Sequence, residues 1–419
     1  MLFQSPKGIS DILPEDQPYW RFLESRAEET AAGFGYSRIE TPMFEDARLF
    51  VRGIGEVTDI VEKETYTFED RGGDVVTLRP EGTAPVCRAY LQHGMHNLPQ
   101  PVRLYYMATN FRYERPQAGR YRQHHQFGIE VFGDADAAID AEVIEVGWRV
   151  LDSVGIGDKT LGLNSIGDSD CRPGYIEELQ TYYNRHTEII CRDCQRRLEQ
   201  NPLRLLDCKV DSCQPVIAEA PHSTDYLCPA CQEHWDALLG YIGDLGLPYG
   251  IDHRLVRGFD YYTRTVFEIT PPGEGSQGTM LGGGRYDGLI QELGGAPTPG
   301  IGFGMGIERA ILNVKQQGVA LPAEEGPKVM VAHLGTPAKK VAAGMASRLR
   351  LAGIPAVLAP ERGLRSQLRY ATSLAASHAV IIGDDELERG VVVVRDLGKG
   401  EQREVPMDEL STAFGTKRD

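Results

Sequence analysis

The sequence has no hydrophobic run long enough to cross a membrane and no apolar core near its N-terminus. A membrane-spanning helix needs roughly 18 consecutive apolar residues, and no stretch of this chain approaches that length. The first residues become acidic by Asp11 instead of continuing into an apolar segment, so we expect no secretion signal. These absences predict a cytoplasmic protein that makes no use of a membrane.

Positive charge is also scarce. The 419 residues carry 44 Lys+Arg against 60 Asp+Glu, a formal net charge of −16, which is unusual for a protein that binds nucleic acid. Residues 327–419 hold 14 Lys+Arg against 11 Asp+Glu, so the acidic excess belongs to the rest of the chain. Any contact with RNA must therefore use local basic patches.

No dinucleotide-binding motif fits the glycine-rich run at 300–306. Met305 and Ile307 occupy the positions where G-x-G-x-x-G requires its third glycine. Glycine alternates with apolar residues in GIGFGMG instead, which permits a ligand to lie flat against a strand. The length, with 41% hydrophobic and 25% charged residues, is that of a soluble globular protein of two or three domains.

The stretch 110–133, NFRYERPQAGRYRQHHQFGIEVFG, predicts two strands joined by a turn at Pro116 and Gly119. Side chains alternate between the faces of a strand. The polar residues expected to share a face are Arg112 and Glu114 on the first strand, and Gln126, Gly128 and Glu130 on the second. Arginines buried beside carboxylates are costly without a ligand or partner. An ordinary hairpin with a solvated face is the alternative, but an anionic substrate on this face explains the residues better.

A second hairpin is predicted from strands at 66–68 and 75–78, around an Arg-Gly-Gly turn. It leads into RPEGT at 79–83, where we expect Thr83 to cap the helix that follows. The carboxylate of Glu81 and the hydroxyl of Thr83 could both accept hydrogen bonds from a ligand ammonium group. A simple turn and cap is the alternative.

The segment 255–269, LVRGFDYYTRTVFEI, combines a permanent cation with aromatic hydroxyl groups. Arg257 precedes a glycine, and Tyr261 and Tyr262 follow closely. The planar guanidinium suits a phosphoryl group because it pairs with two oxygens and does not deprotonate. A surface strand with a stray arginine is the alternative.

Six of the eight cysteines lie between residues 191 and 231. Two C-x2-C pairs, Cys191 with Cys194 and Cys228 with Cys231, flank two further cysteines at 208 and 213. Such pairs allow tetrahedral thiolate coordination of zinc, and structural disulfides are not expected without an export signal. The four paired cysteines therefore suggest a structural Zn²⁺ site, with inert reduced cysteines as the alternative.

The C-terminal region alternates predicted strands and helices. Strands are expected at 329–334, 356–358, 379–382 and 391–394, and helices at 338–352 and 364–377, after a linker at 321–327. This order predicts an α/β domain with a largely parallel sheet. Nearer the N-terminus, helices are expected at 17–34 and 136–154, with a strand at 36–42.

These motifs together resemble the histidyl family of class II aminoacyl-tRNA synthetases over nearly the whole chain. Residues 111–133 look like the second class II motif, and 300–309 like the third. The PKG-x-x-D opening and the I-x-T-P at 39–42 are similar to the N-terminal region and first motif, whereas 255–269 looks like the signature of the histidyl family itself.

The resemblance implies an α+β fold. Residues 1–322 would form a class II catalytic domain, with an antiparallel sheet flanked by helices and a helical insertion at about 168–245 that packs over the acceptor end of tRNA. Residues 327–419 would form the α/β anticodon-binding domain. The first motif would build a homodimer, and ATP would lie bent on the sheet without a P-loop.

The resemblance also implies roles for individual residues. The side chains expected to bind L-histidine are Glu81, Thr83, Gln126, Glu130, Arg257, Tyr261 and Tyr262. Those expected to bind ATP are Arg112 at the α-phosphate, Glu114 near the adenine, Arg120 at the outer phosphates and Arg309 at the γ-phosphate. Arg112 and Arg257 would be catalytic, and Mg²⁺ would accompany the outer phosphates.

The activity implied is the ATP-dependent ligation of L-histidine to tRNA(His) through a histidyl-adenylate, as in protein biosynthesis. One alternative is the non-catalytic, histidine-binding regulatory paralogue of histidine biosynthesis, which typically lacks the C-terminal domain. Another is a class II ligase for a different amino acid. The presence of Arg257 and of residues 327–419 disfavours the first, and Glu130 with the 257–262 segment disfavours the second.

Overall fold

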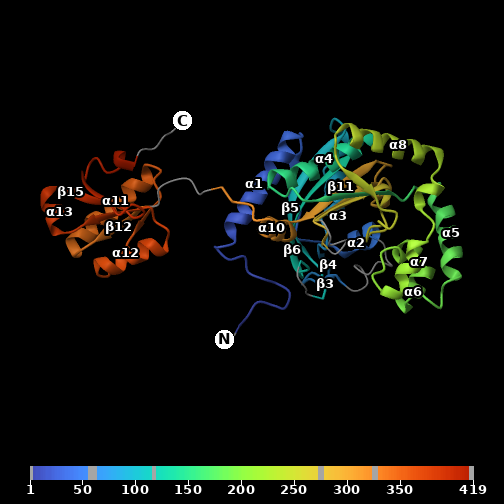
Figure 1. The fold of residues 1–419 in the computed structure, drawn as a ribbon, viewed down its shortest axis with the longest axis horizontal. Coiled ribbons are helices and arrows are strands. Elements are labelled where there is room, and N and C mark those ends of the chain that lie inside the picture. The colour runs from blue at the N-terminus through green and yellow to red at the C-terminus, as the bar shows by residue number, and fades with distance from the viewer. Residues whose placement is uncertain (1–2, 55–63, 116–118, 272–277, 323–328, 415–419) are drawn as a thin grey trace. The chain divides into compact units, whose positions relative to one another are not determined.

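The computed structural model describes residues 3–54, 64–115, 119–271, 278–322 and 329–414. The chain divides into two compact units, Met1–Leu321 and Pro322–Asp419 (Figure 1). Pro116 and most of the predicted linker lie outside the described residues. Among the described helices, none combines the length and apolar composition that a membrane span requires.

An eight-stranded sheet forms the centre of the first unit. Its strands in spatial order are β1 (Ser37–Arg38), β5 (Val102–Phe111), β6 (Gln123–Phe132), β11 (Gly300–Gly306), β10 (Leu281–Arg285), β9 (Thr263–Thr270), β7 (Thr160–Ser165) and β8 (Tyr249–Ile251). Neighbouring strands are antiparallel except in the outermost pairs, β1 with β5 and β7 with β8. The predicted antiparallel sheet is confirmed.

The two faces of this sheet differ because side chains alternate along each strand. On β6, Phe127, Ile129 and Val131 are buried in the main hydrophobic core, together with the alternate residues of β11 and β9. The intervening positions of β6, from Gln126 to Glu130, point to the opposite face. This alternation places one polar strip over the middle of the sheet.

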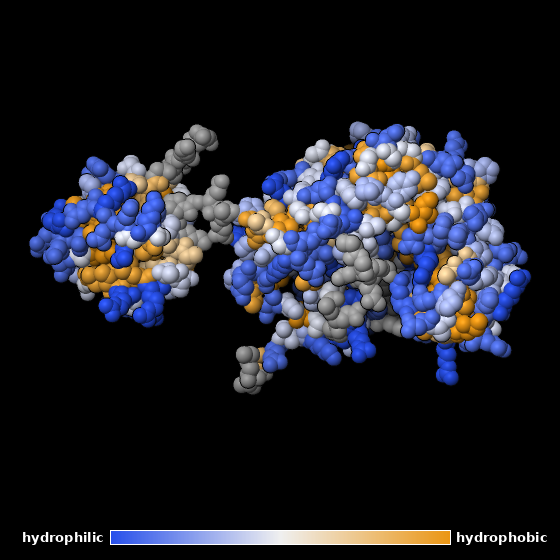
Figure 2. All heavy atoms as spheres, viewed as in Figure 1, coloured by the Kyte–Doolittle hydropathy of each residue, from blue (hydrophilic) through white to orange (hydrophobic). Residues whose placement is uncertain are grey.

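Four helices cover the apolar face: α1 (Gln17–Gly33), α4 (Ala137–Ser153), α8 (Pro229–Asp244) and α10 (Ile307–Gln316). The first two agree with the predicted helices at 17–34 and 136–154. Asp136 fixes the start of α4, since its Oδ1 accepts the N–H of Ala138 at 2.8 Å. In the view of Figure 2 the surface of this unit is mostly hydrophilic, with scattered hydrophobic patches.

A small three-stranded sheet and three helices complete this part of the unit. They are β2 (Phe44–Asp46), β4 (Val75–Leu78), β3 (Tyr66–Glu69), α2 (Ala47–Ile54), α3 (Thr83–Gln92) and α9 (Leu289–Glu292). The predicted hairpin is therefore confirmed. The strand predicted at 36–42 is shorter, because the carbonyl of Thr41 binds the Arg79 guanidinium at 2.8 Å instead of a neighbouring strand.

The predicted cap of α3 needs correction. Glu81 caps this helix: its carboxylate accepts the N–H groups of Thr83 and Ala84 at 2.6 and 2.8 Å. The longer Glu81 side chain reaches both free N–H groups at the helix start. The hydroxyl of Thr83 is therefore left for another partner.

Between β7 and α8 the chain forms only helices and turns, in agreement with a helical insertion. Its helices are α5 (Arg172–Asn184), α6 (Arg192–Gln200) and α7 (Gln214–Ala218), with short 3-10 turns between them. Its buried side chains join those of α3 and α9 in a second hydrophobic core on the polar side of the sheet. The insertion therefore packs on the side of the sheet where the predicted site residues lie.

The second unit is a five-stranded sheet with helices. In chain order its elements are β12 (Val329–His333), α11 (Thr336–Leu351), β13 (Ala356–Leu358), α12 (Leu364–Ser373), β14 (His378–Ile382), α13 (Asp384–Arg389), β15 (Val391–Asp396) and β16 (Gln402–Pro406). The three strands β13, β12 and β14 are parallel, and β15 and β16 add antiparallel. Sequence reasoning located the first four strands but did not predict α13 or β16.

Candidate active site

A cavity of about 1240 Å³ lies over the polar strip of the eight-stranded sheet. It brings together nearly all the side chains predicted from separate motifs: Glu81, Thr83, Arg112, Glu114, Arg120, Gln126, Arg257, Tyr261, Tyr262 and Arg309. Glu130 is the exception, because it is fully buried directly beneath the cavity floor. Residues more than two hundred positions apart thus form one site.

Glycines on the central strands give the site side chains their space. A Cβ on Gly302 would overlap the carboxylate of Glu130, and one on Gly304 would overlap the amide of Gln126. A Cβ on Gly282 would likewise overlap the guanidinium of Arg257. The glycine-spaced strand was expected to admit a flat ligand, and in the structure its glycines leave room for Gln126 in the cavity wall and for Glu130 beneath the cavity.

Glu130 accepts hydrogen bonds from three hydroxyl groups. Thr83 Oγ1 and Tyr106 Oη donate to its Oε1 at 2.8 and 3.2 Å, and Tyr286 donates to its Oε2. Burial raises the pKa of Glu130 to about 8, although these hydroxyl groups favour the ionised form. In its ionised form this carboxylate offers about four acceptor positions, so one remains for a ligand donor.

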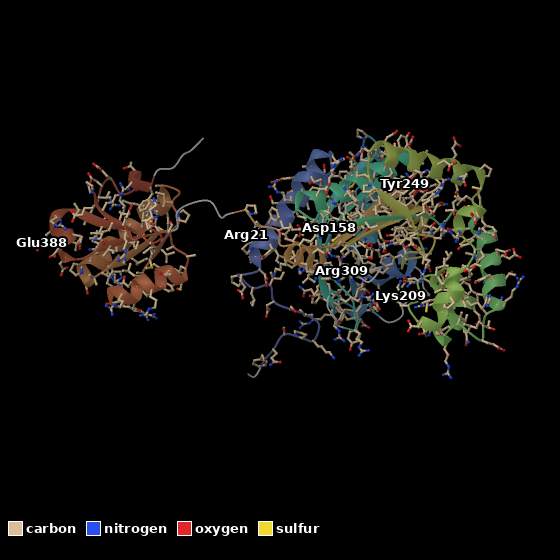
Figure 3. The ribbon with its side chains drawn as sticks, viewed as in Figure 1. Arg21, Asp158, Lys209, Tyr249, Arg309 and Glu388 are labelled. Carbon is tan, nitrogen blue, oxygen red and sulfur yellow. The ribbon has the colours of Figure 1, made fainter. Side chains whose placement is uncertain are left out.

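Among the arginines that line the cavity, Arg112 and Arg120 come from the segment between β5 and β6, and Arg309 comes from α10. Arg112 follows the end of β5, where its Nε donates to the carbonyl of Pro80 at 2.8 Å. Arg309, marked in Figure 3, donates to the carbonyls of Gly119 and Thr279 at 2.8 and 2.7 Å. Burial, then the neighbouring charges of Arg120 and Arg112, lower the pKa of Arg309. Positive charges held close together in this way favour the binding of a multiply charged anion.

Arg112 and Glu114 were expected to share a strand face, but β5 ends at Phe111 and both residues lie beyond it. They still approach each other, with Arg112 Nη1 3.9 Å from Glu114 Oε1. Glu114 Oε2 is buried and has no hydrogen-bond partner among the described residues; Arg120 Nε lies 3.9 Å away. This carboxylate is therefore oriented by electrostatics and can accept a ligand donor.

Arg257 lies across Gly282 and forms an ion pair through Nη1 with Glu268. The second oxygen of Glu268 accepts the hydroxyl of Thr279 at 2.8 Å. The guanidinium carbon of Arg257 is 5.9 Å from the centre of the Tyr262 ring, and its Nε is buried without a hydrogen-bond partner in the described chain. A permanent cation with an unused donor thus faces the cavity.

Sequence reasoning did not select His124, Tyr106 or Tyr286. His124 lines the cavity on the same strand face as Gln126. Burial, then the charge of Arg112, lowers the pKa of His124 to about 3, so this ring is neutral at physiological pH. The alternation along HHQFGIE signals its position, whereas Tyr106 comes from β5 and Tyr286 from the turn after β10, and no local sequence pattern connects them with Glu130.

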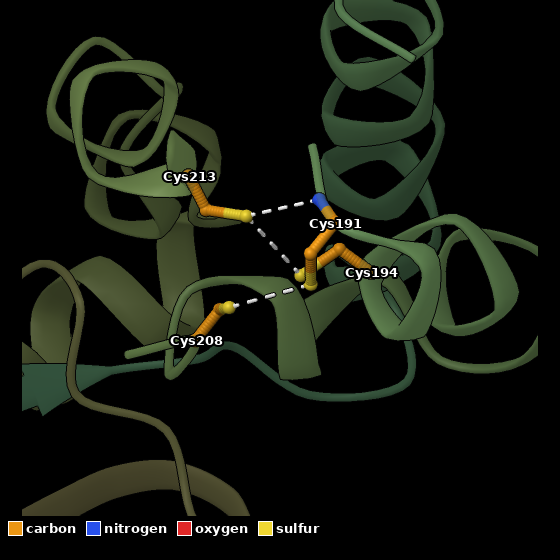
Figure 4. Close-up of side chains that lie close together, drawn as sticks. All are labelled: Cys191, Cys194, Cys208 and Cys213. Atoms are coloured by element: carbon orange, nitrogen blue, oxygen red, sulfur yellow. Dashed lines mark hydrogen bonds between the residues drawn. The ribbon is translucent and has the colours of Figure 1, made fainter. Parts of the chain in front are cut away.

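The predicted four-cysteine site is divided between two clusters. Cys191 and Cys194 meet Cys208 and Cys213, and we call these four residues the cysteine quartet (Figure 4). Cys228 and Cys231 instead meet Cys171 and Asp168. The grouping of Cys191, Cys194, Cys228 and Cys231 is therefore corrected, because the two C-x2-C pairs begin different helices, α6 and α8.

The insertion contributes basic side chains to the cavity wall. They are Arg196, Arg197, Arg204 and Lys209, of which Figure 3 marks Lys209, and Arg254 joins them from the segment after β8. These side chains form a local basic patch beside the arginines of the sheet, and the patch also contains Asp211 and Asp207, the latter paired with Lys209 at 2.9 Å. Such a patch suits a phosphate-bearing partner.

Comparisons with known proteins agree on one family. The family model for histidyl-tRNA synthetase matches residues 8–310, and the model for an anticodon binding domain matches residues 328–417. A histidine–tRNA ligase of Dehalococcoides mccartyi is 55% identical over 98% of this chain and 98% of that relative. One from Desulforamulus reducens is 49% identical over the same shares. The crystal structure of apo Staphylococcus aureus histidyl-tRNA synthetase superimposes with a TM-score of 0.83 at 36% identity, covering 99% of this chain and 100% of that one.

Proposed function

The chain belongs to the histidyl-tRNA synthetase family and ligates histidine to tRNA with ATP, and we propose that the cavity on the eight-stranded sheet is where L-histidine is activated. The proposed domains are residues 1–322 for catalysis, with the insertion at about 168–245, and residues 327–419 for anticodon binding. The observation that carries the proposal is the convergence on one cavity of the four predicted arginines, Arg112, Arg120, Arg257 and Arg309, above the buried Glu130.

Histidine is proposed to bind above Glu130. Its ammonium group would meet Glu81 and Thr83, and its carboxylate would meet Arg257. Its imidazole would lie near Gln126, Tyr261 and Tyr262, with a ring N–H donating to the remaining acceptor position of Glu130. Support comes from the three hydroxyl groups that already hold this carboxylate in place.

ATP is proposed to bind beside it, with Arg112 at the α-phosphate, Arg120 and Arg309 at the outer phosphates and Glu114 near the adenine. The Mg²⁺ that accompanies ATP would take most of its ligands from phosphate and water, and Glu268 is a carboxylate of the same cavity that could hold it. The ion neutralises charge on the phosphates.

In the proposed reaction the histidine carboxylate attacks the α-phosphorus and pyrophosphate leaves. No general base is needed, because the attacking carboxylate is already ionised. Arg112 and Arg257 stabilise the negative charge that develops at the α-phosphate, and the cavity holds two anions at reacting distance. A ribose hydroxyl of the terminal adenosine of tRNA(His) then takes histidine from the adenylate, and AMP leaves. The basic side chains of the insertion would lie beside the acceptor end.

We also propose a homodimer in the cytoplasm. Phe44, Tyr66, Phe68, Val76 and Leu78 share one face of the small sheet, with Asp46 at its end. Phe44 and Phe68 are 55% and 47% exposed, which leaves an apolar face for a second copy. The eight free cysteines suit a reducing compartment.

A structural zinc ion in the cysteine quartet belongs to the same proposal. Cys191 Sγ lies 3.9 Å from Cys208 Sγ, and Cys194 Sγ lies 3.9 Å from Cys213 Sγ. A tetrahedral zinc with Zn–S bonds of about 2.3 Å separates its sulfur atoms by about 3.8 Å. The N–H groups of Cys191 and Val210 also point at ligand sulfur atoms, an arrangement that stabilises thiolate charge.

ATP–pyrophosphate exchange with each amino acid offered separately tests the proposal. Exchange that depends on histidine alone is expected. Binding of histidine without any exchange would instead favour the regulatory paralogue, and exchange with another amino acid would overturn the substrate assignment.

A further inference from the structure

A second group of metal-binding side chains lies at the base of the insertion, and the sequence did not suggest it. Asp168, Cys171, Cys228 and Cys231 each place one donor atom within 4.8 Å of the other three. Cys171 and Cys228 stand at the N-termini of α5 and α8, the first and last long helices around the insertion. We propose that these four residues bind a second zinc ion, through three thiolates and one carboxylate oxygen.

The distances fit tetrahedral coordination. Asp168 Oδ1 lies 3.6 Å from Cys171 Sγ and 4.0 Å from Cys228 Sγ. A zinc ion with bonds of about 2.3 Å to sulfur and about 2.0–2.2 Å to oxygen separates these atoms by about 3.5 Å. Gly167 leaves room for the cluster, since a Cβ there would lie 2.6 Å from Cys171 Sγ.

The surroundings suit an anionic metal site. Three thiolates and a carboxylate carry four negative charges, of which zinc neutralises two. The N-termini of α5 and α8 face the cluster and favour negative charge. The other oxygen of Asp168 accepts from Arg264 Nε and Nη2 at 3.3 and 3.1 Å, the kind of outer partner that orients a metal ligand.

Hydrogen bonds connect this cluster with the backbone that lines the cavity. Arg264 has a φ of 50°, a left-handed conformation that is strained for arginine, and its N–H donates to the carbonyl of Gly167 at 2.7 Å. Arg172, next to Cys171, donates to the carbonyls of Gly167 and Tyr262 at 2.8 and 2.7 Å. The second zinc therefore fixes the backbone that carries Tyr262, a positioning role that rests on the proposed histidine pocket.

Zinc counting on the full-length protein, purified with zinc and reductant and without chelator, tests the site. Wild type is expected to hold two zinc ions per chain. Cys171→Ser with Cys228→Ser, and separately Cys208→Ser with Cys213→Ser, should each hold one. Asp168→Asn should bind its second zinc at least about tenfold more weakly in a chelator titration, whereas Asp170→Asn, an exposed neighbour, should match wild type.

The KM for histidine is the second quantity to measure. Loss of the second zinc in Cys171→Ser with Cys228→Ser should raise the KM for histidine in pyrophosphate exchange about tenfold, with the KM for ATP unchanged. Loss of zinc from the cysteine quartet, in Cys208→Ser with Cys213→Ser, should leave the KM for histidine unchanged.

Two results would overturn the inference. One is wild-type protein that holds a single zinc removed entirely by the cysteine-quartet variant. The other is a Cys171→Ser, Cys228→Ser variant that still holds two. Neither result bears on the proposed activity. That proposal fails if zinc-loaded wild type shows no histidine-dependent ATP–pyrophosphate exchange.

Discussion

Thr83 donates its hydroxyl to Glu130 across 2.8 Å, although 47 residues separate them in the chain. Thr83 lines the cavity and Glu130 lies beneath its floor. The hydroxyl of Thr83 is available because Glu81, and not Thr83, accepts the free N–H groups at the start of α3. This pair joins the start of α3 to the central sheet and fixes the position of a buried carboxylate beneath the cavity.

Replacing Glu130 by alanine should impair the use of histidine far more than that of ATP. The variant loses the remaining acceptor position and leaves the hydroxyl groups of Thr83, Tyr106 and Tyr286 without their partner. A lost buried hydrogen bond costs roughly 1–3 kcal/mol or more, so kcat/KM for histidine should fall at least about tenfold in pyrophosphate exchange. Glu29→Ala, on the exposed face of α1, is the control; an unchanged kcat/KM in Glu130→Ala would contradict the role of Glu130.

Glu130 should also make stability depend on pH. Its pKa is about 8 in the folded chain against an ordinary value of 4.5, so the folded state holds the additional proton between these values. The free energy of unfolding contributed by this group therefore falls as pH rises through that window, by at most about 1.4 kcal/mol per pH unit. Glu130→Gln removes the titration.

Urea unfolding at several pH values would measure this effect. The stability of Glu130→Gln relative to wild type should increase from pH 5 to pH 8 and then level off. Glu29→Gln should show no such trend. A relative stability that does not vary with pH would mean that Glu130 ionises normally in the fold.

Arg257→Ala should reduce kcat for pyrophosphate exchange, with a smaller change in histidine affinity. Removing a preorganised charge beside the α-phosphate typically costs about 2.7–4 kcal/mol, or roughly a hundred- to a thousandfold in rate. Arg257→Lys should recover little, because a point charge cannot form a bidentate contact.

The ion pair with Glu268 calls for a control, since Arg257→Ala also leaves that carboxylate unpaired. The double variant Arg257→Ala, Glu268→Gln removes both charges and should remain as slow as the single variant. Recovery of the rate in the double variant would show that Arg257 serves only to neutralise Glu268.

Gly302→Ala should destabilise the first unit. The added Cβ would overlap the carboxylate of Glu130 and the backbone carbonyl of Ile129, and overpacking of this kind typically costs about 1–3 kcal/mol. Gly240→Ala is the matched substitution, because a Cβ there meets nothing within 4 Å on α8. It should stabilise by roughly 0.5–1 kcal/mol. Equal thermal midpoints for the two variants would refute the packing argument.

Phe68→Glu should convert the proposed dimer to a monomer. The charge falls on the exposed apolar face of the small sheet, where burying it without a partner is costly. Light scattering coupled to size exclusion would report the mass, with Leu351→Glu, 84% exposed on α11, as the control. A wild type of 46.3 kDa in solution would contradict the dimer.

Local patterns in the sequence were sufficient for much of the fold. Helical spacing located α1 and α4, turn residues located the β3–β4 hairpin, and the alternation of strands and helices indicated the class of the second unit. These features depend on residues close in the chain, so periodicity and turn chemistry report them directly. The motifs at 111–133, 255–269 and 300–309 likewise contain most of the predicted site residues that line the cavity.

The tertiary structure determined which side chains of the site contact one another. Glu81 rather than Thr83 caps α3, Tyr106 on β5 and Tyr286 after β10 both donate to Glu130, and Arg257 pairs with Glu268. The C-x2-C pairs separate for the same reason: each begins its own helix, and the packing of those helices selects Cys208 and Cys213 for one pair, Cys171 and Asp168 for the other. The sequence by itself determined which chemical groups this protein carries, whereas their pairing depends on distances across the sheet and between helices that only the folded chain sets.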